Sequence, residues 1–123
     1  MSTDKLTFEL QDGASPNEHI YRLKGPMVLD NMLALHETLQ AETVATILDM
    51  TEVSYVDSAG LGKLATSYIT HQKHGRKLYL VGLNGRVKEL LQVTRLDLLL
   101  EVFPSVKEAR SAYLLWRTGR IGA

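Results

Sequence analysis

Cysteine is absent from this chain of 123 residues, which excludes a disulfide framework and a thiolate metal site. Net charge is also lacking, because 14 basic residues balance 14 acidic ones. Since binding to nucleic acid or to an anionic membrane usually depends on excess positive charge, we expect a protein partner or a small ligand instead. No run approaches the roughly 20 apolar residues that cross a bilayer. The first residues also lack a signal peptide's apolar core, which predicts a cytoplasmic protein without direct membrane insertion.

The length and the hydrophobic content of 45% fit one domain with a proper core. No linker-like segment interrupts the sequence, and no repeat of about 20 to 50 residues is present. We therefore expect a single domain over residues 1–123, with its core at about 6–116 and short frayed ends.

The central feature of the sequence is a buried strand followed by an amphipathic helix. Residues 44–50 are a nearly continuous apolar run, typical of a strand buried on both faces. The apolar spacing then becomes helical, at Leu61, Leu64, Ala65, Tyr68 and Ile69. Asp57 or Ser58 can cap this helix, and Gly75 would end it. A serine hydroxyl is therefore predicted at a strand-to-helix junction.

Further elements are predicted before this unit. Residues 6–10 and 19–24 alternate in polarity like half-buried strands, and the breaker-rich stretch 12–17 between them favours a β-hairpin. Asp30 can then cap a helix. The inward positions of that helix are Met32, Leu35 and Leu39.

The pattern continues after the central unit. Residues 77–83 predict a strand, and Asn84 can cap a helix with Val87, Leu90 and Leu91 inward. Residues 98–103 predict a last strand. Ser105 and Glu108 have the spacing of a capping box, in which Ser105 accepts from the third amide of a final helix. The inward positions of that helix are Val106, Ala109, Tyr113 and Trp116, and residues from 118 onward predict a frayed tail.

The order of elements is therefore ββαβαβαβα. Right-handed crossovers lay the later strands parallel, so only the first strand needs to be antiparallel. The sequence predicts an α/β fold with a mixed, mostly parallel β-sheet and helices packed against it.

The central residues carry a resemblance to a known family. The turn YVDSAGLG at 55–62, the strand LYLVGL at 78–83 and the helix start NGRV at 84–87 are similar to those of STAS domains, and in particular of anti-sigma factor antagonists. In that family the matching serine, here Ser58, is phosphorylated by a kinase that is itself the anti-sigma factor. The resemblance implies that the unmodified protein binds the anti-sigma factor and frees sigma, that phosphorylation ends this binding, and that a phosphatase is a further partner. It implies no enzyme activity, cofactor or metal.

Two departures from the antagonist pattern leave an alternative open. Ala59 follows the serine where antagonists often have Ser or Thr, so Ser58 is the only hydroxyl of the turn. The second strand continues Gly25-Pro26-Met27-Val28, where antagonists usually have Gly-x-Leu-Asp. This segment is similar to the STAS modules of sulfate-type anion transporters. The alternative is therefore an interaction module of another signalling complex or of a membrane anion-transport system.

The resemblance also predicts a partner-binding surface, because loops at the same end of neighbouring parallel strands meet. We expect Met27 and Val28 to be exposed anchors on this surface. Its members are Asp57, Ser58, Ala59, Gly60, Leu61, Gly62 and Lys63 at the helix start, Thr66 and Ser67 on the helix, and Gly25, Met27 and Val28 in the facing loop.

Plainer interpretations exist for several of these residues. A serine at a helix start is most often only a cap, which contributes about 1 kcal/mol. His71 and His74, with Lys73, fall in the last helical turn as dipole partners, and a histidine pair without a third ligand is weak evidence for metal. His19 and His36 have no visible partner. The leucine-rich stretch 90–100 favours core over a binding groove, and Trp116 fits either the edge of the core or an interface.

Two enzyme-like alternatives are disfavoured. A hydrolase with Ser58 as nucleophile would need a nearby base, and His71 and His74 lie about 20 Å along the same helix. The motif also has Val56 in place of the first glycine of Gly-x-Ser-x-Gly. A phosphoaccepting receiver built on Asp57 would need an acidic pair for Mg²⁺ after the first strand and a lysine at the end of the last one, and neither is present.

Overall fold

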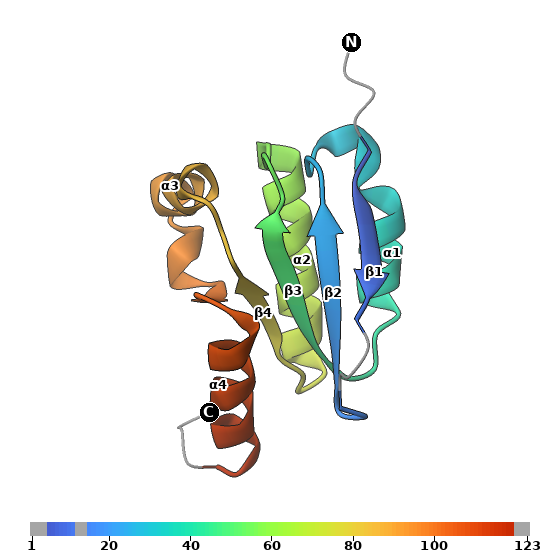
Figure 1. Ribbon diagram of the computed structural model, residues 1–123, viewed down its shortest axis with the longest axis vertical. Coiled ribbons are helices and arrows are strands. Elements are labelled where there is room, and N and C mark those ends of the chain that lie inside the picture. Colours follow the sequence, from blue (N-terminus) through green and yellow to red (C-terminus); the bar gives the residue numbers. More distant parts are fainter. Residues whose placement is uncertain (1–4, 12–14, 120–123) are drawn as a thin grey trace.

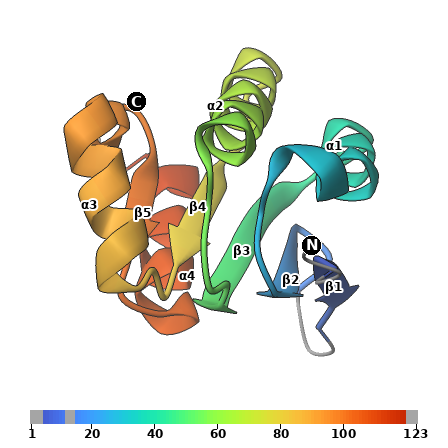
Figure 2. The ribbon, with the colours of Figure 1, turned by 90° about the horizontal axis from the view of Figure 1, so that it is seen from above.

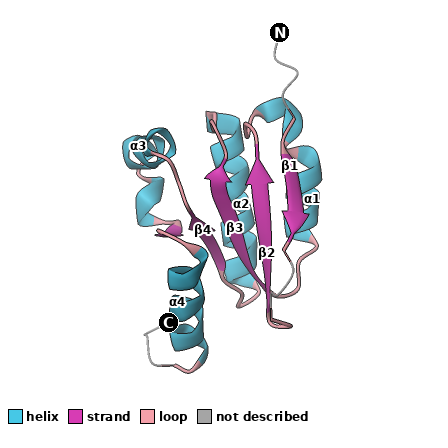
Figure 3. Ribbon diagram, in the orientation of Figure 1, coloured by secondary structure: helices cyan, strands magenta, loops and turns pink. Residues whose placement is uncertain are grey.

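The computed structural model describes residues 5–11 and 15–119 and has the predicted α/β architecture (Figure 1). Strands and helices alternate after an initial hairpin (Figure 3). Two short 3₁₀ helices, η1 and η2, accompany them. The elements are β1 Thr7–Leu10, β2 Glu18–Lys24, η1 Leu29–Asn31, α1 Leu33–Gln40, β3 Ala45–Glu52, α2 Ser58–Lys73, β4 Leu78–Val81, α3 Gly85–Thr94, η2 Leu96–Leu98, β5 Glu101–Phe103 and α4 Val106–Arg117.

The strands form one sheet in the order β1-β2-β3-β4-β5. β1 is antiparallel to β2, which confirms the predicted hairpin, and β2 to β5 run parallel. Figure 1 shows the carboxyl ends of β2 and β3 at the same edge of the sheet. The loops that follow these strands are therefore brought together, as a parallel arrangement requires.

The helices cover the two faces of the sheet unequally. α1 and α2 lie on one side and α4 on the other, with α3 at the β4–β5 end (Figure 2). Alternate residues of each strand supply the two cores, so that Leu48 and Leu80 pack under α1 to α3, whereas Ile47 and Tyr79 pack under α4. The small, fully buried Ala109 lets α4 approach the sheet closely.

Asn84 lies at the start of α3 and Gly75 just after the end of α2, as the sequence predicts. Asn84 Oδ1 accepts from the Val87 N–H at 2.9 Å and caps α3. Gly75 has a φ of +70° directly after the C-cap of α2, a backbone conformation that favours glycine.

Two predicted capping interactions at helix starts are wrong, because other side-chain hydrogen bonds form in their place. Asp30 does not cap α1. Asn31 organises the entry instead, accepting from Val28 N (3.0 Å) and donating to Pro26 O (2.9 Å), which winds residues 29–31 into η1. Ser105 donates its hydroxyl hydrogen to the Glu108 carboxylate, so the predicted capping box does not form.

The last strand is also shorter than the predicted 98–103, because the chain forms η2 at 96–98 before β5. Leu10 at the end of β1 is half exposed although it alternates with partly buried residues. Parts of the predicted 12–17 loop, at 12–14, and of the predicted tail, at 120–123, lie outside the described residues.

Candidate phosphorylation and partner-binding site

Asp57 is the N-cap of α2. Its backbone is extended, Oδ1 accepts from the Gly60 N–H at 2.7 Å, and Oδ2 accepts from the Leu29 N–H at 3.3 Å. Of the two candidate caps in the sequence, Asp57 therefore holds the position. Ser58 becomes the first helical residue, and its side chain is exposed.

The start of α2 is locked against the segment that follows β2. Met27 and Val56 form a parallel bridge, Met27 N donates to Tyr55 O (2.8 Å), and Asp57 N donates to Met27 O (3.1 Å). Gly60 faces this segment so closely that a Cβ on it would lie 2.3 Å from the Met27 carbonyl oxygen. Only glycine permits this approach, which fixes Ser58 relative to the neighbouring loop.

The predicted surface is partly exposed and partly core. Ser58, Gly62, Lys63 and Thr66 are exposed, and Asp57, Ala59, Gly25 and Val28 are partly exposed. By contrast Gly60, Leu61 and Ser67 are buried.

The expectation that Met27 is an exposed anchor is wrong, because its side chain is 0% exposed. The bridge to Val56 continues the alternation of the sheet by one more position and turns Met27 into the main core.

Three exposed apolar residues at this end were not identified from the sequence. Leu29 and Leu33 are 67% and 70% exposed, and the backbone of Leu29 contacts Asp57. For Leu33 the signal was a helical phase different from that of the buried stripe at 32, 35 and 39, whereas Leu29 lies before α1, in η1. Tyr55 is 43% exposed, and the Arg86 guanidinium lies 5.8 Å from its ring centroid. Apolar side chains therefore flank both sides of the exposed start of α2.

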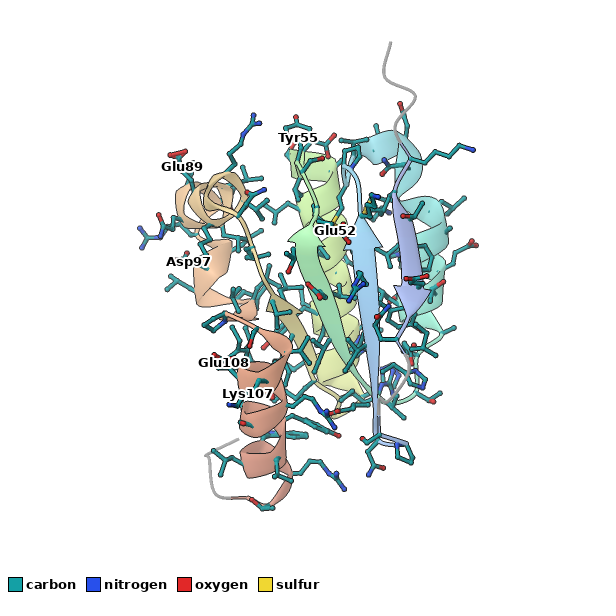
Figure 4. The ribbon with its side chains drawn as sticks, viewed as in Figure 1. Glu52, Tyr55, Glu89, Asp97, Lys107 and Glu108 are labelled. Atoms are coloured by element: carbon teal, nitrogen blue, oxygen red, sulfur yellow. The ribbon has the colours of Figure 1, made fainter. Side chains whose placement is uncertain are left out.

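Tyr55 and Arg86 also line a groove between the loop before α2 and α3, together with Glu89, Leu90 and Val93. Figure 4 shows Tyr55 at the end of β3 and Glu89 on α3 at the same end of the molecule. Val93 is 74% exposed. The expectation of core for residues 90–100 is accordingly correct for Leu91 and Leu100 but wrong for Val93 and Leu98.

The electrostatics of this helix start favour an anion. The first N–H groups of a helix have no intrahelical partner, and Asp57 engages only that of Gly60 with its side chain. The amides of Ser58 and Ala59 remain for another acceptor, at the positive end of the helix dipole. A phosphate on Ser58 would lie at this end.

The histidines lie elsewhere and are held by other contacts. His71 is fully buried, with Nδ1 3.0 Å from Ser67 O and Nε2 3.1 Å from Thr46 Oγ1. Burial lowers the pKa of His71 from its ordinary value of 6.5, so the expectation of a charged dipole partner is wrong. His19 does have a partner, because Nδ1 lies 2.8 Å from the buried Glu42 carboxylate.

A metal centre has no support in the described residues, where no three His, Cys, Asp or Glu side chains cluster in a way that could hold an ion. Nor does any helix within residues 5–11 and 15–119 have the length and apolar character of a membrane span.

Residues 8–109 match the model of the STAS domain. The chain belongs to the STAS domain family. A curated relative is the anti-sigma-B factor antagonist of Listeria monocytogenes, which is 34% identical over 61 residues. The match covers 50% of this chain and 54% of the Listeria protein, so the chain spans about half the length of the curated relatives it matches.

Solved structures share the fold of this STAS chain. An anti-sigma factor antagonist of Mycobacterium paratuberculosis has a TM-score of 0.77 at 21% identity, covering 90% of this chain and 96% of that one. The Bacillus cell fate determinant SpoIIAA in its phosphorylated form has a TM-score of 0.65 at 15% identity, covering 87% and 99%. A sulfate transporter family protein of Wolinella succinogenes has a TM-score of 0.68 at 24% identity, covering 84% and 90%.

Proposed function

We propose that this STAS chain is an anti-sigma factor antagonist that binds a kinase-type anti-sigma factor and is switched off by phosphorylation of Ser58. The observation that carries the proposal is the exposed hydroxyl of Ser58 at the first position of α2, on a surface with exposed apolar side chains at both sides. The names of the Listeria relatives support the antagonist role, and the Bacillus structure in its phosphorylated form supports a phosphorylated state.

The contact surface differs from the one expected from sequence. Leu29 and Leu33 take the place of Met27 as apolar contacts on the α1 side, and Tyr55 with Arg86 forms the α3 side. Aromatic residues and arginine are enriched among the residues that dominate binding energy. We expect Tyr55→Ala or Leu33→Ala to weaken partner binding by about 1 to 2 kcal/mol, with little effect on thermal stability because both side chains are exposed.

Phosphorylation would act on binding and not on folding. The helix start can hold a phosphate of about −1.5 to −2 charge without disturbing α2. The partner, however, would have to desolvate that charge next to the Asp57 carboxylate. An unpaired charge buried in an interface costs several kcal/mol, which corresponds to roughly a hundredfold loss of affinity or more.

The test begins with a pull-down from the native lysate to recover the cognate kinase. The protein is then incubated with this kinase and ATP, and the modified residue is identified by mass spectrometry. We expect label on Ser58, unchanged circular dichroism and loss of partner binding. Ser58→Asp should lose binding in part, whereas Ser58→Ala should stay bound.

Ser105→Asp is the matched control, because Ser105 is another exposed serine at a helix start, on α4. It should bind the partner normally. Label on a different residue, or undiminished binding after complete phosphorylation of Ser58, would contradict the proposed switch. Asp57→Ala should slow phosphorylation, since loss of the cap loosens the first turn that presents the serine.

A further inference from the structure

A second groove lies on the face of the sheet opposite α2. It runs between α4 and the start of β2 and is lined by Ser15, Glu18, Lys107, Arg110, Leu114 and Arg117, among others. Figure 4 shows Lys107 on α4, well separated from Tyr55 at the carboxyl end of β3. A ligand in this groove would therefore leave the Ser58 surface free.

The groove is positively charged although the whole chain is neutral. Lys107, Arg110 and Arg117 are all exposed and follow one flank of α4 at positions i, i+3 and i+10. Glu18 is the one acidic residue among the described lining residues, and its carboxylate is already paired with Arg110 (Nε to Oε1, 2.5 Å). The remaining charge excess attracts an anionic ligand.

The spacing of the cations indicates a long ligand that lies along α4. Lys107 and Arg117 are separated by ten residues of helix, or about 15 Å of backbone, so a ligand that contacts both spans most of α4. Leu114, which is 59% exposed, lies between Arg110 and Arg117 on the same flank. We propose that this groove docks an acidic segment of a protein partner, with carboxylates along its length and an apolar residue that contacts Leu114.

Two other anionic partners fit the groove less well. Single-stranded nucleic acid is bound by stacking on free aromatic faces. Here Tyr113 stacks on Trp116 (ring centroids 6.0 Å apart), Arg117 covers Tyr113 at 5.7 Å, and Lys77 covers Trp116 at 5.1 Å. A bilayer is flat, whereas Ser15 and Glu18 form a second wall opposite α4.

The probe is a fluorescein-labelled 12-residue helical peptide with Glu at positions 1, 4 and 11 and Leu at position 8, compared with a scrambled peptide of the same composition. Binding to the full chain is followed by anisotropy. Trp116 is the one tryptophan of the sequence and lies on α4, so its fluorescence reports binding at this helix. We expect the designed peptide to bind at least fivefold more tightly than the scrambled peptide. Its affinity should fall as the salt concentration rises.

Charge variants locate the site. Lys107→Glu and Arg117→Glu should each weaken binding about threefold to tenfold, because each replaces an attraction with a repulsion. Glu18→Gln should strengthen binding, since a carboxylate is removed while an acceptor for Arg110 stays. Lys88→Glu is the control for net charge, because Lys88 is exposed on α3 and away from the groove, and it should change binding less than twofold.

Several results would overturn the inference. The first is that the peptide does not bind at 1 mM, and the second is that Lys107→Glu and Lys88→Glu change peptide affinity equally. The third is that the protein binds a 12-nucleotide oligo-dT or phosphatidylserine vesicles more tightly than the peptide. Ser58→Asp is included in the same assay. Normal peptide binding by this variant would show that the groove works independently of the proposed phosphorylation switch, whereas loss of binding would count against a separate docking site.

Discussion

Two glycines in the first turns of α2 offer a sharp test of how the site is built. A Cβ on Gly62 would have no described atom from outside its own stretch of helix within 4 Å, whereas a Cβ on Gly60 would lie 2.3 Å from Met27 O. Gly62→Ala should therefore stabilise the protein by about 0.5 to 1 kcal/mol through helix propensity alone. Gly60→Ala gains the same propensity but must separate two backbones.

The cost of Gly60→Ala follows from the geometry. An ordinary contact begins near 3.4 Å, so α2 or the Met27 segment has to move by about 1 Å. That segment is held by hydrogen bonds of 2.8 and 3.1 Å to the loop before α2. Overpacking of this kind costs about 1 to 3 kcal/mol, which exceeds the gain in propensity. We expect a net loss of about 1 to 2 kcal/mol.

Urea unfolding followed by circular dichroism measures both variants against the parent protein. The midpoints should move in opposite directions, and the difference between the two variants should be about 1.5 to 3 kcal/mol. Kinase labelling should slow only in Gly60→Ala, because only this variant displaces Ser58. Stabilisation by both substitutions would refute the close approach of α2 to Met27.

Two further predictions concern the core. Met27→Ala should lower the free energy of unfolding by about 2 to 5 kcal/mol in thermal or urea unfolding, because removal of the buried side chain leaves a cavity. An unchanged free energy of unfolding would instead indicate that Met27 is a surface residue. Because the folded-state pKa of His71 is lowered, the unfolded chain binds more protons below the ordinary value of 6.5, and stability should fall as the pH is reduced through that value. His71→Gln should reduce this dependence, and an unchanged slope in unfolding titrations between about pH 5 and 8 would contradict the role of His71.

The sequence determined the architecture because hydrophobic periodicity and caps are local signals. The apolar run at 44–50 became β3, the helical spacing from Leu61 became α2, and Asn84 caps α3 as its position predicts. The motif at 55–62 identified the family for the same reason, since a tight strand-to-helix turn needs particular residues at fixed spacing. These features depend on neighbours within a few residues.

The tertiary structure decided which residues of the site are surface and which are core. Met27 follows Gly25-Pro26, as an exposed loop residue would, but its bridge to Val56 turns it inward. Leu33 is apolar and yet exposed, because α1 packs with its other side on the sheet, and Leu29 is exposed in the short helix η1 that precedes α1. His71 lies in a polar helix end by sequence and in the core by structure, where Thr46, 25 residues away, is its partner. Such contacts join segments that only the packed sheet brings together, so no local pattern contains them.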